Sequence, residues 1–135
     1  MLEAAHFEAE DSRKSRVASA IIDLLCFYKT GEGRPQDIVT KMRFVVETYC
    51  TYTYPEFFGS DDSLASIIEK IRTTGAQHPA CALLDELDAI HAFSQGHYRG
   101  PDSAGIAARP LDLGELTDFV RRTLKIVKAI PSGAP

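Results

Sequence analysis

An arginine and a glutamate, Arg43 and Glu47, form the best candidate pair for chemistry in this 135-residue chain. Side chains four residues apart on a helix can meet. A guanidinium there can hold a phosphate group, while the carboxylate takes a proton or orients the arginine. The same spacing also describes an ordinary surface ion pair, which is worth only about 0.3–0.5 kcal/mol. By spacing alone, the ion pair is the better interpretation.

A second group of polar residues lies at the end of a predicted helix and in the loop that follows. It consists of His91, Ser94, Gln95 and His97. A histidine at a helix C-terminus suits general acid or base catalysis, because its pKa lies near neutrality and the helix end favours its charged form. The ordinary alternative is a hydrogen-bonded histidine at the core edge for His91 and a solvated loop residue for His97. The sequence alone favours this alternative.

Motifs that bind nucleotides or metals, or that mark a nucleophilic serine, are absent. The chain contains no Gly-x-x-x-x-Gly-Lys-Ser/Thr loop, no His-Glu-x-x-His helix and no Gly-x-Ser-x-Gly elbow. The three cysteines, Cys26, Cys50 and Cys81, are widely spaced in apolar helical stretches. They are expected to be buried free thiols in a reducing compartment rather than zinc ligands. We therefore expect no metal and no cofactor in this chain.

Composition and charge narrow the class of protein further. The chain is 44% hydrophobic and 25% charged, with a formal net charge of −4. That charge argues against general nucleic-acid coating, which needs clustered lysine and arginine. No apolar run approaches the roughly 20 residues that span a bilayer. The acidic start of the chain is unlike a secretory or organellar signal. A cytoplasmic protein with no membrane segment is expected.

Apolar residues at helical spacing, separated by glycine and proline, predict the elements that position these side chains. The expected fold is all-α, a single bundle of about five helices that forms one domain over residues 1–135. Residues 1–11 can fray, 97–110 form a long loop, and 131–135 form a tail. Gly75 is expected to end the third helix, which Ser60 or Asp62 caps. The predicted helices start near Ser12, Pro35, Ser60, Pro79 and Asp112.

The second predicted helix carries an aromatic C-terminal end. Residues 49–54 alternate like a strand, but no other segment offers a strand for pairing, and Pro55 disfavours helix in the residue before it. We therefore predict that this run ends the helix. Phe44 falls on the far side of the same helix, where it is expected to face a second partner surface.

Several short motifs follow one another in an order that resembles a known family. That order resembles the C-terminal helical region of a large bacterial family of P-loop ATPases with ABC/SMC-like heads. The family includes the wobble-nucleotide-excising tRNA anticodon nucleases. The resemblance covers roughly Ser12 to Ile130, and its motifs are Arg43-x-x-x-Glu47, Tyr54-Pro55, Ile90-x-x-Phe-Ser94 and the Val-Arg-Arg-Thr-Leu run of residues 120–124.

The resemblance implies a role for each polar candidate. In the nucleases of this family, an arginine, a glutamate and a downstream histidine resemble a catalytic triad for cleavage of RNA. Arg43 would stabilise the phosphorane charge, and Glu47 would hold it or take a proton. The histidine of the family pattern is replaced, because Gln95 follows Ser94 and His91 stands where the pattern has asparagine. Either His91 or His97 would have to take that role.

Three functional hypotheses follow, in order of preference. The first is a non-catalytic helical C-terminal module of an AAA/ABC-type ATPase, as a fragment or a stand-alone relative. It would contact its ATPase head domain, another protein partner or a second copy in a homodimer through Phe44, the tyrosines and the long loop. The second is a metal-independent ribonuclease that uses Arg43, Glu47 and His91 or His97 on RNA. The third is an independent helical protein that binds a partner helix.

Overall fold

Helices account for nearly all of the regular structure in the chain, and the computed structural model describes residues 2–97 and 112–130. Side chains are described for residues 14–95 and 112–130. Within these ranges there are five α-helices and no strand, so the predicted all-α bundle is confirmed. None of these helices combines the length and the apolar character that crossing a membrane requires. The helices are α1 (Leu2–Thr30), α2 (Pro35–Thr53), α3 (Leu64–Thr74), α4 (Leu84–His97) and α5 (Leu113–Ile126).

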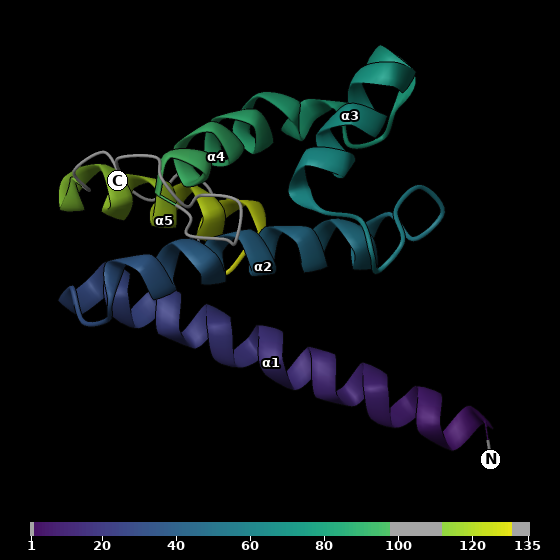
Figure 1. Ribbon diagram of the computed structural model, residues 1–135, viewed down its shortest axis with the longest axis horizontal. Coiled ribbons are helices and arrows are strands. Elements are labelled where there is room, and N and C mark those ends of the chain that lie inside the picture. Colours follow the sequence, from purple (N-terminus) through teal and green to yellow (C-terminus); the bar gives the residue numbers. More distant parts are fainter. Residues whose placement is uncertain (1, 98–111, 131–135) are drawn as a thin grey trace, which may run out of the picture.

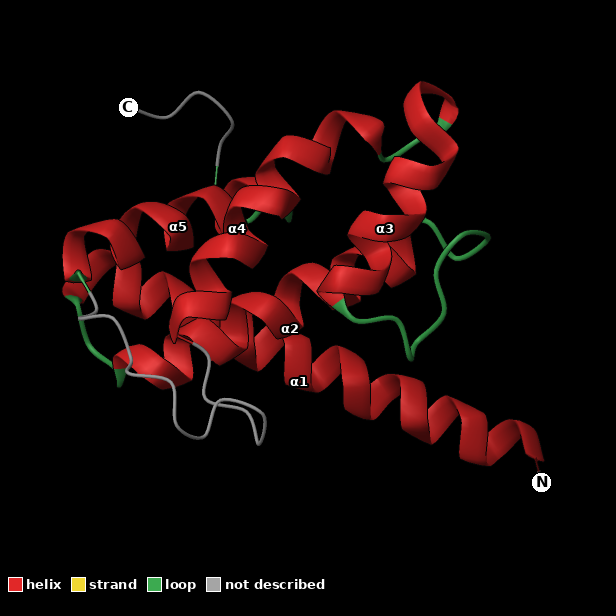
Figure 2. Ribbon diagram, turned by 45° about the horizontal axis from the view of Figure 1, so that its top comes forward, coloured by secondary structure: helices red, strands yellow, loops and turns green. Residues whose placement is uncertain are grey.

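The central element is α2, which packs against each of the other four helices. As Figure 1 shows, α1 and α2 run antiparallel to each other, and α4 lies on the side of α2 away from α1. The helix α5 packs against both α1 and α2. The shorter α3 lies beyond the C-terminal end of α2 and turns the chain back into α4. In both Figure 1 and Figure 2, the N-terminal part of α1 extends past the other helices.

Apolar side chains from all five helices form one core around α2. The α2 residues Val39, Met42, Val45 and Val46 are fully buried, as the periodicity of this helix predicts. Burial of such side chains is the main favourable term in folding. The largest contributors from the other helices are Leu24, Leu64, Ile67, Ile71, Leu87, Ile90, Leu116 and Leu124.

Local signals in the sequence set most helix ends. Pro35 occupies the first turn of α2, and Gly75, with a φ of 79°, follows the last residue of α3. At the start of α5, the Asp112 carboxylate accepts hydrogen bonds from the Gly114 and Glu115 amides. The predicted cap of α3, Ser60 or Asp62, is wrong. The cap is Ser63, whose hydroxyl oxygen accepts a hydrogen bond from the Ser66 amide.

Two other helix starts differ from the prediction. The helix α1 begins at Leu2 instead of Ser12, although the acidic start of the chain lacks a clear apolar stripe. Short 3-10 turns at Gly75–Gln77 and Cys81–Leu83 precede α4, so that helix begins after the predicted Pro79. The prediction for residues 49–54 is confirmed, since they belong to the end of α2 and to its cap at Tyr54.

The environment of the cysteines differs from the expectation. All three are free thiols, but only Cys50 is buried, while Cys26 is exposed and Cys81 is half-buried. Phe44, which was expected to face a second partner surface, is half-buried, and part of its cover comes from α1. The guanidinium of Arg16 on α1 lies 5.2 Å from the centre of its ring. The predicted loop is wrong at His97, which belongs to α4, and the rest of that loop and the C-terminal tail lie outside the described residues.

The turn between α1 and α2 requires glycine at position 33, and this requirement can be tested. Its φ is 130°, and an added Cβ would lie 3.2 Å from Cδ1 of the buried Ile38. We expect Gly33→Ala to lower the free energy of unfolding by about 1–2 kcal/mol, because both backbone strain and this contact act against it. The control is Gly59→Ala, where a Cβ meets nothing within 4 Å. Equal stability of the two variants in urea denaturation would contradict this account.

Candidate functional site

The structure brings three of the four predicted site residues to one place, where α2, α3 and α4 meet. Arg43 and Glu47 come from α2, and His91 comes from α4 together with the buried Ser94. We call these four residues the polar junction. The charge of Arg43 lowers the pKa of both Glu47 and His91, so Arg43 is the residue that links the other two candidates electrostatically. The polar junction therefore contains the residue types that the ribonuclease hypothesis requires.

Glu47 binds the first amide of the next helix rather than forming a simple ion pair with Arg43. Its Oε2 accepts a hydrogen bond of 2.6 Å from the backbone nitrogen of Leu64, the first residue of α3. The first amides of a helix have no partner within the helix, so a carboxylate there is stabilising. Burial raises the pKa of Glu47, while the Leu64 hydrogen bond and the Arg43 charge act in the opposite direction. The helix cap is therefore added to the electrostatic attraction between Glu47 and Arg43.

Arg43 connects α2 to α4 through a buried hydroxyl group. Its Nη1 donates a hydrogen bond of 3.3 Å to Oγ of Ser94, which is fully buried. The Ser94 hydroxyl in turn donates to the backbone carbonyl of His91 at 3.0 Å. This chain of bonds satisfies a buried polar group and holds the guanidinium at the helix interface. Arg43 is therefore positioned by the fold, half-buried between α2 and α4.

His91 is held by its own helix. Its Nε2 lies 3.0 Å from Nε2 of Gln95, one turn further along α4. Burial lowers the pKa of His91, and the positive charges of Arg43 and Arg72 lower it further, while Asp88 acts in the opposite direction. The neutral imidazole is thus favoured at neutral pH, which is the form that a general base needs. His97 belongs to the last turn of α4, but its side chain lies outside the described residues.

The cavity beside Glu47 is small. It has a volume of about 80 Å³ and is lined by Phe44, Glu47, Thr48, Thr51, Ser60 and Asp62. Pockets that enclose a ligand of nucleotide size are several times larger, at roughly 300–1,000 Å³. Neither Arg43 nor His91 lines this cavity, so Glu47 faces it without the other two candidate residues. Within the part of the chain that the structure describes, no group of three or more histidine, cysteine or acidic residues can hold a metal ion.

Asp62 supports the same end of α3, a role that the sequence only partly indicates. Its carboxylate accepts hydrogen bonds from the Gly59 amide, the Ser66 hydroxyl and the Lys70 ammonium group, at 2.7–2.8 Å. The bonds from Lys70 and Ser66 lower the pKa of Asp62 to about 2. An acidic residue just before α3 indicated a cap in the sequence. The three partners of Asp62 could not be predicted, because they depend on how the loop before α3 folds back onto the helix. Glu47 and Asp62 thus hold the start of α3 from two sides.

The role of Glu47 as a cap gives a testable contrast between two variants. Glu47→Gln keeps an acceptor for the Leu64 amide, and Glu47→Ala removes it. At neutral pH we expect Glu47→Ala to lower the free energy of unfolding by about 1–2 kcal/mol, as loss of a helix cap does. Glu47→Gln is expected to change it much less. Urea denaturation followed by circular dichroism measures both.

The pH dependence of the same variants has a defined sign. The pKa of Glu47 in the folded protein lies above its usual value of 4.5 because of burial. Such a group stabilises the folded state at low pH, and this contribution is lost as the pH rises through the folded-state pKa. The stability of the wild type should therefore fall relative to Glu47→Gln as the pH rises above 4.5. A difference that stays constant with pH would show that Glu47 is not desolvated.

Comparison with known proteins adds no constraint on this site. The chain matches no model of a protein family, no curated protein and no solved structure. The contacts around the polar junction, together with the motif resemblance described for the sequence, are therefore the basis on which a function is inferred.

Proposed function

We propose that the chain is a non-catalytic helical module that mediates protein contacts, with an AAA/ABC-type ATPase head as its partner. The observation that carries this proposal is the use of the polar junction for folding. The Glu47 carboxylate caps α3, and Arg43 donates to the buried Ser94. A carboxylate committed to a backbone amide in a cavity of about 80 Å³ is poorly placed to act on a polynucleotide. The cytoplasmic location stays a prediction that accompanies this proposal.

A contact surface is available at the C-terminal end of α2. Tyr52 and Phe57 are each 41% exposed, and we call these two residues the aromatic corner. The ring of Phe57 packs against the buried His78, with 4.5 Å between ring centres. This contact holds the ring in place, so less side-chain entropy is lost when a partner covers it. Aromatic side chains of this kind are enriched at protein interfaces.

A specific observation supports the second candidate, a metal-independent ribonuclease. The charge of Arg43 acts on both Glu47 and His91, and burial biases the His91 imidazole towards its neutral form. An arginine next to a neutral histidine has the elements needed to stabilise a phosphorane and to remove a proton. This candidate ranks second because Glu47 has a structural partner.

Complex formation with an ATPase head tests the first proposal. The chain would be mixed with purified AAA/ABC-type heads encoded in the same genome, and the mass of the product would be measured by size-exclusion chromatography with light scattering. We expect a complex that the double variant Tyr52→Ser, Phe57→Ser weakens about tenfold or more, as loss of buried aromatic anchors does. The matched control is Ile22→Ser, because Ile22 is an apolar residue on α1 with 63% exposure. No complex with any head would refute the proposal.

Incubation with total tRNA separates the two candidates. The module proposal predicts that the wild type leaves the tRNA intact, as do Arg43→Ala and Glu47→Gln. Glu47→Gln is the informative variant, because it keeps the cap of α3 while removing the carboxylate charge. Cleavage by the wild type that both substitutions abolish, with folding unchanged by circular dichroism, would establish the ribonuclease instead.

A further inference from the structure

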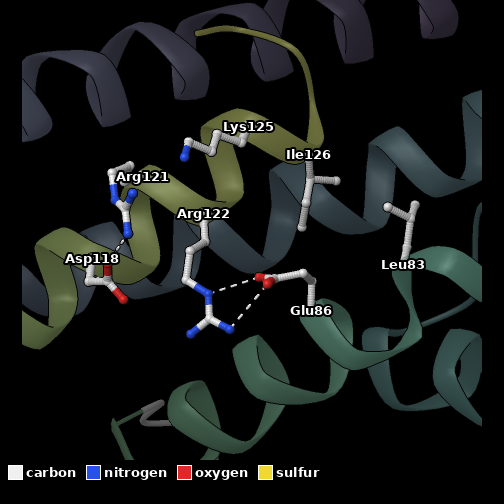
Figure 3. A pocket seen from close by; sticks show the side chains of 7 residues that line it. All are labelled: Leu83, Glu86, Asp118, Arg121, Arg122, Lys125 and Ile126. Carbon is white, nitrogen blue, oxygen red and sulfur yellow. Dashed lines mark hydrogen bonds and ion pairs between the residues drawn. The ribbon is translucent and has the colours of Figure 1, made fainter. Parts of the chain in front are cut away.

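A groove lies between the start of α4 and the second half of α5, where it includes two residues of the Val-Arg-Arg-Thr-Leu run noted in the sequence. Its volume is about 500 Å³, within the range of pockets that hold a ligand or a peptide side-chain cluster. Three cations of α5, Arg121, Arg122 and Lys125, line it together with apolar and acidic residues. Figure 3 shows Arg121 and Lys125 next to each other on α5, while Arg122 points towards α4. We call this feature the α4–α5 groove.

Arg122 has a structural role in the groove. Its Nε and Nη2 donate to the two oxygens of Glu86 on α4, at 2.8 and 3.2 Å. The guanidinium also lies 4.8 Å from the centre of the Phe119 ring. A bidentate pair that is stacked on a ring has a defined geometry. Arg122 and Glu86 therefore hold α4 and α5 at a fixed separation, as the dashed lines in Figure 3 indicate.

The other two cations are available to a partner. Arg121 pairs with Asp118 one turn earlier on α5, but both side chains are well exposed, at 36% and 45%. Exposed pairs of this kind contribute little, so a stronger acceptor can replace Asp118 at low cost. Lys125 has no ion-pair partner among the residues whose side chains are described. Two positive charges can therefore be offered to an anionic group in a chain whose net charge is −4.

Apolar surface continues the groove beyond the cations. Leu83, just before α4, is half-buried and lines the same space, and Ile126, the last residue of α5, reaches it with only 8% of its surface exposed (Figure 3). The carbonyl end of α5 carries a partial negative charge near Lys125, which opposes an anion bound by charge alone. A ligand that adds apolar contacts to its charge overcomes this opposition. The groove thus selects for a negative group next to an apolar one.

We propose that the α4–α5 groove binds an acidic amphipathic segment of a protein partner, with its carboxylates on Arg121 and Lys125 and its apolar side chains on Leu83 and Ile126. This inference rests on the proposed function, because it adds a second docking surface to the aromatic corner. A helical segment with carboxylates one turn apart matches the spacing of Arg121 and Lys125, which is also one turn. An apolar face on the same segment would cover Leu83 and the small exposed edge of Ile126.

The lining of the groove favours a peptide over RNA. Glu86 and Asp118 lie in the same groove, and their carboxylates repel a continuous run of phosphates. Proteins that bind single-stranded RNA also offer aromatic rings on which bases stack. No aromatic side chain is among the described residues that line this groove. Discrete carboxylates with apolar neighbours fit the mixed lining better.

Binding of defined probes to the intact chain tests the proposal by fluorescence anisotropy. The probe is a labelled helical peptide with glutamates one turn apart and leucines along the same face. Two control peptides replace either the glutamates by glutamine or the leucines by alanine. We expect the first peptide to bind at least about tenfold more tightly than either control at low salt, and to bind more weakly as salt is added.

Two charge-reversal variants locate the site. Lys125→Glu is expected to weaken binding about tenfold or more, because it places a negative charge in the groove. Lys14→Glu is the matched control, since it makes the same charge change at an exposed position on α1. Its effect should stay within about twofold, as for a distant charge that salt screens. Arg121→Gln is a second variant of the groove, and it leaves the Arg122–Glu86 pair intact. It is also expected to weaken binding of the acidic peptide, because it removes one of the two positive charges.

Several outcomes would overturn the proposal. These are equal binding of the acidic and glutamine peptides, equal weakening by Lys125→Glu and Lys14→Glu, or tighter binding of a labelled oligouridine that depends on Lys125. The last result would assign the groove to phosphates. Peptide binding without any ATPase complex would support the groove while the proposed function fails. An ATPase complex without peptide binding would support the proposed function while the groove proposal fails.

Discussion

The hydrogen bond from the Leu64 amide to the Glu47 carboxylate is the interaction on which the arrangement of α2, α3 and α4 depends. It connects the central helix to the first residue of the next one, at 2.6 Å. The first amides of a helix need an acceptor from outside, and water is partly excluded at this junction. A half-buried carboxylate supplies the acceptor but is itself costly to desolvate. Arg43 offsets that cost, since its charge favours the ionised form of Glu47.

The same network constrains what the polar junction can do chemically. Arg43 is held at Ser94, and the Ser94 hydroxyl is held at the His91 carbonyl, so one series of contacts runs from α3 through α2 to α4. Each polar group in this series provides a hydrogen bond or an opposite charge to the next one, which offsets the cost of burying it. Polar contacts of this kind specify how helices align, in addition to any stability they provide. A side chain that fulfils this role is less free to bind substrate, which is why the non-catalytic proposal ranks first.

Charge is distributed unevenly over the bundle, and the cations of α5 have two different environments. Arg122 faces α4, where Glu86 and the Phe119 ring fix its position. Arg121 and Lys125 face the groove, where solvent reaches them. An acidic chain that gathers cations on one helix presents a local field opposite in sign to its overall charge. Selective attraction of an acidic partner is compatible with such a distribution.

The sequence by itself determined the helical class, the run of α2 and several helix ends. Apolar spacing places α2 from Pro35, and the signals at Gly75 and Asp112 act within a few residues of themselves. Such short-range effects can be read without knowing the rest of the fold. The start of α1 could not be predicted from the sequence, because no apolar stripe or cap marks Leu2.

Only the tertiary structure decided the partners of the polar residues. The spacing of Arg43 and Glu47 permits an ion pair, yet Glu47 bonds an amide 17 residues away and Arg43 a hydroxyl 51 residues away. Which bond forms depends on how much water each group loses, and that loss is set by the helices packed around it. The exposure of Cys26 was decided in the same way, since it depends on which face of α1 the core covers.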